Sequence, residues 1–179
     1  MTSAMRITAL TDQPETVAAL SDLLIEVVAN GGSVSFMYPL AREDAAAFWK
    51  VSLARAVAGD RVVLGAWEGD ELIGTVTLDL AMPPNQPHRA EIAKLMTRVS
   101  RRGRGVARSL MREAERIAVE RGRTLLVLDT AAEEGAAGFY ERLGYIRVGA
   151  IPGYALKPQG GLTATIIFYK APAPVRAPG

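Results

Sequence analysis

Apolar and polar residues alternate along several short stretches of the chain, and a period of two is typical of strands. Two of the longer stretches are separated by Gly69 and Asp70, a pair that favours a tight hairpin turn. A run of apolar residues around Leu126 is typical of a buried central strand. The pattern predicts strands at residues 6–10, 61–68, 71–80, 91–97, 124–129, 145–149 and 164–170.

Elsewhere, apolar residues recur every three or four positions, which places them on one face of a helix. The first helix is expected to begin at Pro14 and to end before Gly31. Further helices are expected at residues 42–57, 103–121 and 136–143. This order of elements predicts a mixed α/β domain with one main sheet. We expect a single domain over residues 1–170, followed by a flexible tail rich in proline and alanine at 171–179.

The composition is that of a soluble globular protein, with 49% hydrophobic and 22% charged residues in a chain of 179. The absence of cysteine excludes disulfides, thiolate metal sites and a cysteine nucleophile. The single histidine, His88, is expected in a surface loop, so no metal site is expected. No apolar segment approaches the ~20 residues that span a bilayer, and no secretory signal pattern is present. We therefore expect a cytoplasmic protein without a membrane partner.

Positive charge is concentrated in one short stretch, although the net charge is only +2. The stretch contains six arginines: Arg98, Arg101, Arg102, Arg104, Arg108 and Arg112. Such a cluster favours an anionic ligand, although a solvated basic surface has the same composition. Nucleic acid is not the expected ligand, because the stretch is short and lacks interleaved aromatic residues.

Glycines in the same stretch lie between a predicted strand and a predicted helix. The first N–H groups of a helix have no partners within the helix, and glycine allows the backbone to approach a ligand closely. Gly103 and Gly105 therefore predict a phosphate-binding turn that the arginines would reinforce. The Gly-Lys-Ser/Thr sequence of a Walker loop is absent. A dinucleotide-binding fingerprint is also excluded, because Arg108 occupies the position of its third glycine. A glycine turn that merely begins the helix is the alternative.

Two motifs resemble the signatures of the GNAT superfamily of N-acetyltransferases. The first is Arg-x-x-Gly-x-Gly/Ala, formed by Arg102, Gly105 and Ala107, and the second is the tyrosine-containing segment 138–145. The resemblance implies a central, mostly antiparallel sheet with helices on both faces. It also implies acetyl-CoA as co-substrate and direct acetyl transfer to an amine in a ternary complex, without a metal.

The resemblance also implies which residues bind the cofactor. The turn that would hold the CoA pyrophosphate consists of Arg102, Gly103, Arg104, Gly105, Val106 and Ala107. The backbone of Leu95, Met96 and Thr97 would bind the pantetheine arm and polarise the thioester carbonyl, as the donors of an oxyanion hole do. Replacing the side chains of Leu95 and Thr97 is therefore expected to matter less than replacing Arg102 or Gly105.

A narrower resemblance extends over most of the chain. Segments 31–37, 89–96, 128–130 and 151–154 are similar to a group of GNAT enzymes that confers tabtoxin resistance by acetylating a β-lactam amino-acid toxin. This implies a small amine as acceptor, such as an amino-acid-like toxin or antibiotic. Phe36, Met37 and Tyr154 are candidates for the acceptor pocket, with plain packing as the alternative.

Acetylation of an amine needs a base, because an alkylamine with a pKa near ~10 is protonated at neutral pH. Glu91 is the first candidate, since it begins the strand that leads to the glycine turn. Asp129 is the second, because it ends a central strand and ligands bind outside such strand ends. Tyr140 is the candidate acid for the departing thiolate, as the resemblance implies. The alternatives are an exposed residue, a helix cap and a core aromatic, respectively.

Other functions and states stay open at the level of sequence. A catalytically silent module that only binds acyl-CoA is the main alternative, although the two carboxylates and the tyrosine favour an enzyme. A serine hydrolase is not expected, because Gly32-Ser33-Val34-Ser35 is not a nucleophile elbow. The chain could be a monomer or a homodimer.

Overall fold

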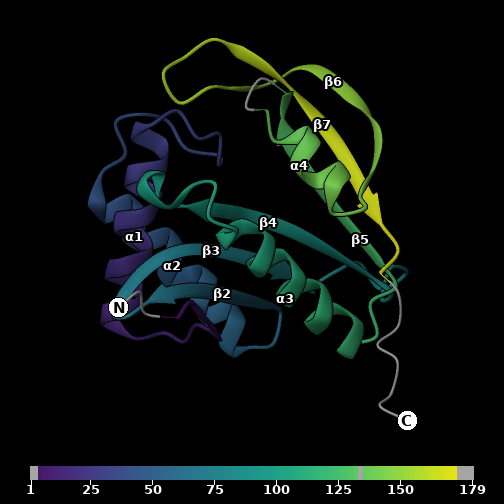
Figure 1. The fold of residues 1–179 in the computed structure, drawn as a ribbon, viewed down its shortest axis with the longest axis horizontal. Helices are drawn as coiled ribbons and strands as arrows, with labels where there is room; N and C mark the ends of the chain where they lie inside the picture. The colour runs from purple at the N-terminus through teal and green to yellow at the C-terminus, as the bar shows by residue number, and fades with distance from the viewer. Residues whose placement is uncertain (1–3, 133–134, 173–179) are drawn as a thin grey trace.

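The structure is a computed structural model that describes residues 4–132 and 135–172. The strands are β1 (Arg6–Ala9), β2 (Arg61–Glu68), β3 (Glu71–Asp79), β4 (Arg89–Thr97), β5 (Leu125–Ala131), β6 (Ile146–Leu156) and β7 (Leu162–Lys170). Within the described residues these seven strands form one sheet, in the order β1-β2-β3-β4-β5-β7-β6 (Figure 1). Neighbouring strands are antiparallel except β4 and β5, which are parallel.

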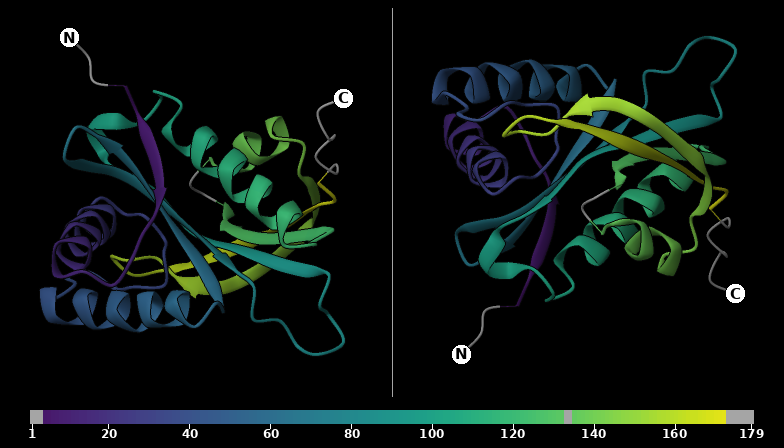
Figure 2. Two further views of the ribbon diagram at one scale, coloured as in Figure 1. Left: turned by 90° about the horizontal axis from the view of Figure 1, so that it is seen from below. Right: turned by 90° about the horizontal axis from the view of Figure 1, so that it is seen from above.

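Helices cover both faces of the sheet (Figure 2). The helices are α1 (Pro14–Ala29), α2 (Arg42–Val57), α3 (Val106–Glu120) and α4 (Ala137–Arg142), and a short 3₁₀ turn, Val99–Arg101, follows β4. The first two helices pack on one face of the sheet and the last two on the other. This arrangement confirms the predicted class, a mixed α/β fold with a mostly antiparallel sheet and helices on both faces.

Each helical layer has its own hydrophobic core. Leu20 of α1 and Trp49 and Leu53 of α2 are fully buried in one core, while Leu110 of α3 and Phe168 of β7 are fully buried in the other. The spacing of four between Trp49 and Leu53 is the same periodicity that predicts the helix in the sequence. Truncating such a side chain to alanine costs about 2–5 kcal/mol. The two cores hold the sheet, and hence its central strands, in a fixed position.

The parallel strands β4 and β5 pair along only part of their length. Residues 89–91 pair with residues 125–127, and beyond them the two strands diverge (Figure 1). β5 continues along β7 as far as Ala131, and β4 continues along β3. The strands therefore separate from each other while each stays paired on its outer side.

A β-bulge interrupts β4 just after the strands separate. Met96 pairs with Thr75 and Ala93 pairs with Thr77, so Lys94 and Leu95 stand opposite a single residue of β3. Lys94 has a φ of 53°, in the left-handed region that residues with a side chain rarely adopt. A bulge changes the direction in which the following side chains point.

The predicted start of α3 at residue 103 is wrong, because the helix begins at Val106. Gly105 has a φ of 83° and cannot belong to a right-handed helix. The glycines therefore form the turn before the helix instead of its first residues.

The predicted end of β6 at residue 149 is also wrong, because the strand continues to Leu156. Pro152 and Gly153 suggest a loop in the sequence, but β6 is an edge strand, where proline is tolerated. The pairing with β7 shifts register between Ile151 and Ala155, which accommodates these two residues. Tyr154 consequently lies in a strand.

Two remaining expectations concern the surface and the end of the chain. His88 is exposed in the turn before β4, as expected. Residues 173–179 of the predicted tail lie outside the described residues. None of the helices in the described ranges combines the length and the apolar character that crossing a membrane would require.

Candidate active site

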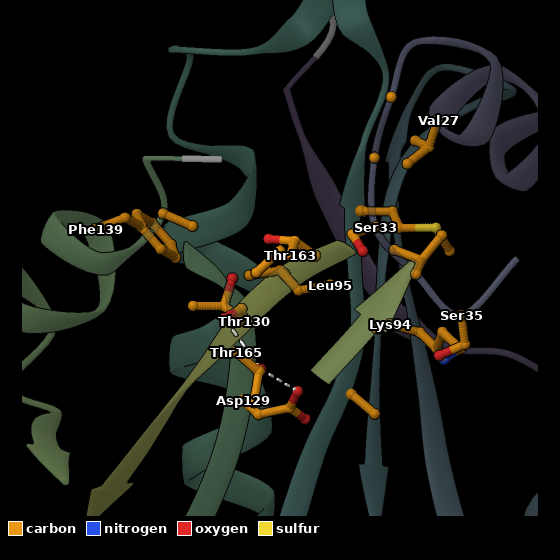
Figure 3. A pocket seen from close by; sticks show the side chains of 18 of the residues that line it. Val27, Ser33, Ser35, Lys94, Leu95, Asp129, Thr130, Phe139, Thr163 and Thr165 are labelled. Carbon is orange, nitrogen blue, oxygen red and sulfur yellow. Dashed lines mark hydrogen bonds between the residues drawn. The ribbon is translucent and has the colours of Figure 1, made fainter. Parts of the chain in front are cut away.

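A cavity of about 710 Å³ lies where β4 and β5 diverge (Figure 3). Residues 92–97 of β4 line one side, and residues 129–131 of β5 line another. α4, the β6–β7 hairpin and the segment that follows α1 supply the rest of the lining. A cavity of this size suits a small molecule or part of a larger cofactor.

The glycine turn before α3 reaches one end of this cavity. Of its residues, Arg102 and Ala107 line the cavity, while Gly103, Arg104, Gly105 and Val106 lie outside the lining. The φ angles of Gly103 and Gly105 are 75° and 83°, and a Cβ on either would meet no described atom within 4 Å. Glycine is therefore required for its backbone conformation and not for space. No side chain of the described residues caps α3, so its first N–H groups remain available to an anion.

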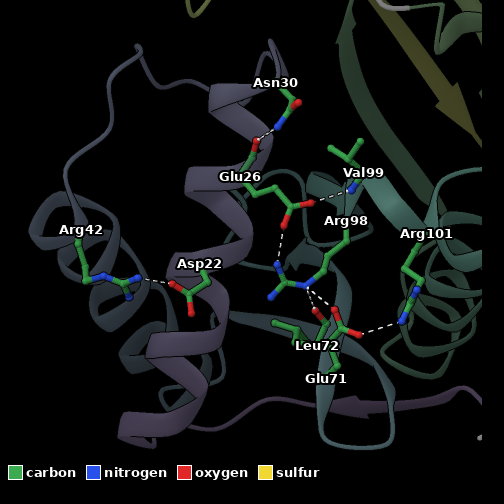
Figure 4. A network of polar contacts seen from close by, with 9 residues as sticks. All are labelled: Asp22, Glu26, Asn30, Arg42, Glu71, Leu72, Arg98, Val99 and Arg101. Atoms are coloured by element: carbon green, nitrogen blue, oxygen red, sulfur yellow. Dashed lines mark hydrogen bonds and ion pairs between the residues drawn. The ribbon is translucent and has the colours of Figure 1, made fainter.

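The six clustered arginines divide into two groups. Arg98 donates to Glu26 at 2.5 Å, and Arg101 lies 2.9 Å from Glu71 (Figure 4). Arg101 also lies 2.9 Å from Glu68. The other four form no ion pair with any described residue: Arg102, Arg104, Arg108 and Arg112. Their positive charge at the beginning of α3 is available for a phosphate-bearing ligand.

The far part of β4 offers backbone groups to the cavity. Leu95, Met96 and Thr97 all line it. Met96 is buried in the core under α1 and α2, whereas Leu95 packs against the other core. Because the pairing of β4 with β5 ends at Glu91, backbone groups on that side of the later residues have no strand partner in the described structure. Such groups can bind an extended ligand as a strand would.

The two predicted bases occupy different positions. Asp129 lines the cavity, and its Oδ2 accepts a hydrogen bond of 2.7 Å from Thr165 Oγ1 (Figure 3). Glu91 lies outside the lining and forms an ion pair with Arg89. Because Glu91 is paired with Val127, two residues before Asp129, both carboxylates belong to the same face of the sheet. The geometry brings Asp129, and not Glu91, to the cavity surface.

Tyr140 lines the cavity from α4 and is only 7% exposed. Its ring packs edge-on against Phe139 at 5.2 Å and against Tyr145 at 6.0 Å between ring centroids. Tyr145 is buried outside the lining, and burial, reinforced by Glu115, raises the pKa of its hydroxyl. Tyr140, the candidate acid from the sequence, therefore reaches the cavity, whereas Tyr145 does not.

Only one of the three predicted acceptor-pocket residues lines the cavity. Tyr154 does so from β6. Phe36 packs edge-on against Phe48 of α2 at 5.2 Å, and Met37 is 45% exposed, so both lie outside the lining. Their neighbour Ser35 lines the cavity instead.

Lys94 also lines the cavity, and the sequence analysis did not single it out. Its Nζ donates to Ser35 Oγ at 3.0 Å and lies 5.7 Å from the centroid of the Phe48 ring. Burial lowers the pKa of Lys94, and the charge of Asp129 opposes this shift. The signal in the sequence was a lysine two residues after Ile92, where the alternation calls for an apolar side chain.

No cluster of three or more metal-ligating side chains occurs in the part of the chain that the structure describes. The polar groups that the cavity presents include the carboxylate of Asp129, the hydroxyl of Tyr140, the ammonium of Lys94 and the backbone of β4.

Comparisons with known proteins identify the family and the fold. The model of the acetyltransferase (GNAT) family matches residues 33–145. An N-acetyltransferase from Staphylococcus aureus Mu50 is 16% identical, with a TM-score of 0.79 over 96% of this chain and 100% of that chain. A candidate acetyltransferase, yncA, from Salmonella typhimurium, solved with its cofactor acetyl-CoA, is 16% identical, with a TM-score of 0.75 over 99% of each chain.

A third similar structure is described as a candidate phosphinothricin N-acetyltransferase. It is 18% identical, with a TM-score of 0.74 over 94% of this chain and 99% of that chain. At these identities the structural likenesses show a shared fold, whereas the family match extends over more than half of the 179 residues. The chain therefore belongs to the GNAT family and is an N-acetyltransferase that uses acetyl-CoA as its co-substrate.

Proposed function

We propose that this enzyme acetylates a primary amine of a small molecule by direct transfer in a ternary complex. The main support is the continuity of one cavity, whose lining includes Asp129 of β5 together with Arg102 and Ala107. The last two belong to the turn at residues 102–107, which we call the phosphate turn. Acetyl donor and amine would meet in this cavity. The absence of cysteine also favours direct transfer, because the chain has no thiol to carry the acetyl group.

Acetyl-CoA supplies an acetyl group activated as a thioester. The residues present fit this molecule: two glycines with positive φ, an uncapped helix start and four arginines without ion-pair partners in the described structure suit a pyrophosphate. The unpaired side of β4 at Leu95, Met96 and Thr97 suits the amide-bearing pantetheine arm. Donors on this edge would also polarise the thioester carbonyl.

Asp129 is our candidate for the general base. It would accept one proton of the acceptor's ammonium group, so that the free amine can attack the thioester carbonyl and form the new N–C bond. The nitrogen of the resulting adduct would lose its second proton to solvent as the C–S bond breaks, which leaves the neutral amide. Thr165 holds the carboxylate in the cavity through its 2.7 Å hydrogen bond. Glu91, the first candidate from the sequence, is engaged by Arg89 and lies outside the lining, so we assign it a supporting electrostatic role.

Tyr140 is our candidate for the general acid. Its position in the cavity lining would allow the hydroxyl to donate a proton to the departing sulfur and to recover that proton from solvent. Its burial beside Phe139 restricts the ring to one orientation, which favours positioned proton transfer.

We propose an amino-acid-like toxin or antibiotic as the class of acceptor. The similarity of four sequence segments to the tabtoxin resistance protein supports this class, as does the likeness in fold to a structure described as a candidate phosphinothricin N-acetyltransferase. We further propose one domain over residues 1–170 in a cytoplasmic protein, as a monomer or a homodimer. In support, the sheet includes strands from Arg6 to Lys170.

Calorimetric titration with acetyl-CoA, followed by an acceptor screen, tests this function. We expect a Kd in the micromolar range, about −8 kcal/mol, and release of free CoA with at least one small amine or amine toxin. Mass spectrometry should then find the acetyl group on the amine nitrogen. Binding without turnover on every amine tested would favour the catalytically silent acyl-CoA-binding module instead.

A further inference from the structure

The side chain of Lys94 lies on the opposite face of the sheet from the one that the regular alternation of side chains along β4 would give it. Ala90 and Ile92 belong to the core beneath α3, and an uninterrupted strand would send the side chain of residue 94 the same way. The bulge instead directs Lys94 toward Phe48 of α2, on the other face of the sheet. The extra residue in β4 therefore keeps an ammonium group out of an apolar core and presents it to the cavity.

Backbone strain is concentrated at the same place. Among the described residues, Ser35 and Lys94 are the two non-glycine residues with positive φ, at 75° and 53°. Both line the cavity, and their side chains are hydrogen bonded to each other (Figure 3). Residues in this conformation persist only where the surrounding structure determines it, and they cluster at binding sites. The contact between two such residues indicates that the position of the ammonium is specified.

The ammonium of Lys94 is left with unused hydrogen-bonding capacity. Lysine has three N–H donors, and within the described structure this one makes a single hydrogen bond, to Ser35, and no ion pair. The Phe48 ring at 5.7 Å offers a weaker cation–π contact. Burial disfavours the charged form and lowers the pKa of Lys94. An anionic ligand group would supply what this ammonium lacks.

The negatively charged carboxylate of Asp129 lies close enough to this ammonium to interact with it electrostatically. Burial lowers the pKa of Lys94, and the charge of Asp129 offsets part of this shift. Within the described residues the two groups form no ion pair. Figure 3 shows Asp129 on β5 and Lys94 beside Ser35, with the end of β6 between the two groups in this view. The cavity thus presents a carboxylate and an ammonium as separate groups.

We propose that Lys94 binds a carboxylate of the acceptor, so that the enzyme selects amines that are also acids, as amino acids are. The inference rests on the proposed function, because it concerns the acceptor of the same cavity. The amine of such an acceptor would face Asp129 while its carboxylate receives the free N–H donors of Lys94. A charge-assisted hydrogen bond of this kind is about twice as strong as a neutral one.

Matched acceptors test this proposal. We would measure kcat/KM with L-lysine and L-lysinamide, L-methionine and L-methioninamide, and β-alanine and β-alaninamide, following release of the CoA thiol. The wild-type enzyme is expected to prefer the acid over its amide by roughly tenfold or more. Lys94→Met should abolish this preference without changing the affinity for acetyl-CoA. Comparing the ratio between variants cancels the different intrinsic reactivity of acid and amide.

Lys50→Met is the matched control, because Lys50 is an exposed lysine of α2 outside the cavity lining. This variant removes the same charge and should keep the wild-type ratio. Lys94→Gln serves if Lys94→Met does not fold, and Lys94→Arg should retain a preference for acids. A general loss of stability would not alter the ratio of acid to amide, so this readout distinguishes ligand binding from a structural role.

Equilibrium binding of the same six compounds to the CoA-loaded protein provides a readout without turnover. Acids that bind more tightly than amides, with the difference lost in Lys94→Met, would support the proposal even if no amine were acetylated and the proposed function failed. Amines acetylated with the same ratio in wild type and Lys94→Met would overturn the role of Lys94 and leave the acetyltransferase function intact. Absence of any preference for acids in the wild type would overturn it as well.

Discussion

At the scale of single residues, each group reaches the cavity for a different physical reason. Gly105 acts through its backbone conformation, since a φ of 83° is open to glycine at no steric cost. Asp129 is held by the hydroxyl of Thr165, and Tyr140 by the aromatic rings around it. Substitutions that remove one function while preserving the shape of the side chain can therefore separate these roles.

Gly105→Val should weaken acetyl-CoA binding by roughly tenfold or more, because a strained turn would lose charge-assisted hydrogen bonds to phosphate. Calorimetry measures this affinity. Gly59→Val is the control, since Gly59 has a φ of 85° but follows α2 and is not part of the turn before α3. Both variants should lose about 1–2 kcal/mol of stability. Equal affinity in Gly105→Val and Gly59→Val would contradict a phosphate-binding turn.

Asp129→Asn should lower kcat by about 10²-fold or more, because an amide cannot accept the proton of the amine. Thr165 can still donate to the amide oxygen, so the fold should persist. Steady-state kinetics compare this variant with Glu91→Gln, whose wild-type carboxylate lies outside the cavity lining. A larger loss in Glu91→Gln than in Asp129→Asn would identify Glu91 as the base.

Tyr140→Phe should lower kcat by about 10²-fold while acetyl-CoA affinity stays near wild type. The loss falls at the low end for general acids, because a thiol with an ordinary pKa near ~8.5 is already a fair leaving group. Tyr145→Phe removes a hydroxyl from the adjacent ring, which is buried outside the cavity lining, and should retain kcat. Wild-type turnover in Tyr140→Phe would exclude its role as the acid.

At the scale of elements, polar contacts tie α1 to the segment that leads into the phosphate turn (Figure 4). Glu26 accepts from Arg98 at 2.5 Å and from the backbone N–H of Val99 at 2.8 Å. Arg98 also donates to the backbone carbonyl of Leu72 at 2.8 Å. The Val99–Arg101 turn is thus fixed from two sides, and with it the position of Arg102.

Glu26→Ala should destabilise the protein by about 1–3 kcal/mol, because it removes the closest ion-pair partner of Arg98, which is only 18% exposed. It should also weaken acetyl-CoA binding, since the turn before Arg102 loses an anchor. Thermal unfolding and calorimetry measure the two effects. Asp22→Ala, on the same helix, breaks a solvent-exposed pair with Arg42 and should cost less than about 1 kcal/mol with no change in affinity.

At the scale of the whole molecule, the net charge is small although positive charge is concentrated in one place. The net charge is +2, yet four arginines at the beginning of α3 have no ion-pair partner among the described residues. Long-range attraction of an anion by the protein as a whole is therefore weak, whereas attraction at the phosphate turn is strong and subject to screening by salt.

Raising the ionic strength from about 0.05 to about 0.5 M should therefore weaken binding of acetyl-CoA several-fold, as the Debye length shrinks. The affinity for acetyl-pantetheine, which lacks the phosphates, should change little over the same range. Titrations of both compounds check this difference. Equal salt dependence of the two would mean that the arginines do not contact the phosphates.

Much of the fold and part of the site follow from local rules that the sequence already contains. Helical and strand periodicities predicted α2 and β2 with their observed bounds, because each is packed against a core on the side where its apolar residues lie. The turn before α3 was equally predictable, since its positive φ angles favour glycine. That this turn binds phosphate stays a prediction. The extension of β6 past Pro152 could not be predicted from local rules, because the hydrogen bonds that make it a strand come from β7.

By itself, the sequence determined the order of the elements and the place of the glycine turn before α3, since these depend on neighbouring residues and apolar spacing. The helices on both faces of the sheet were expected only from the resemblance to a family. Only the tertiary structure decided that Asp129 rather than Glu91 lines the cavity and that Ser35 does so in place of Phe36. It also decided the direction of Lys94. The physical reason is the same in each case. The cavity exists because β4 and β5 separate after residue 91, and the register and bulge that turn each side chain are set by partner strands far away in the sequence.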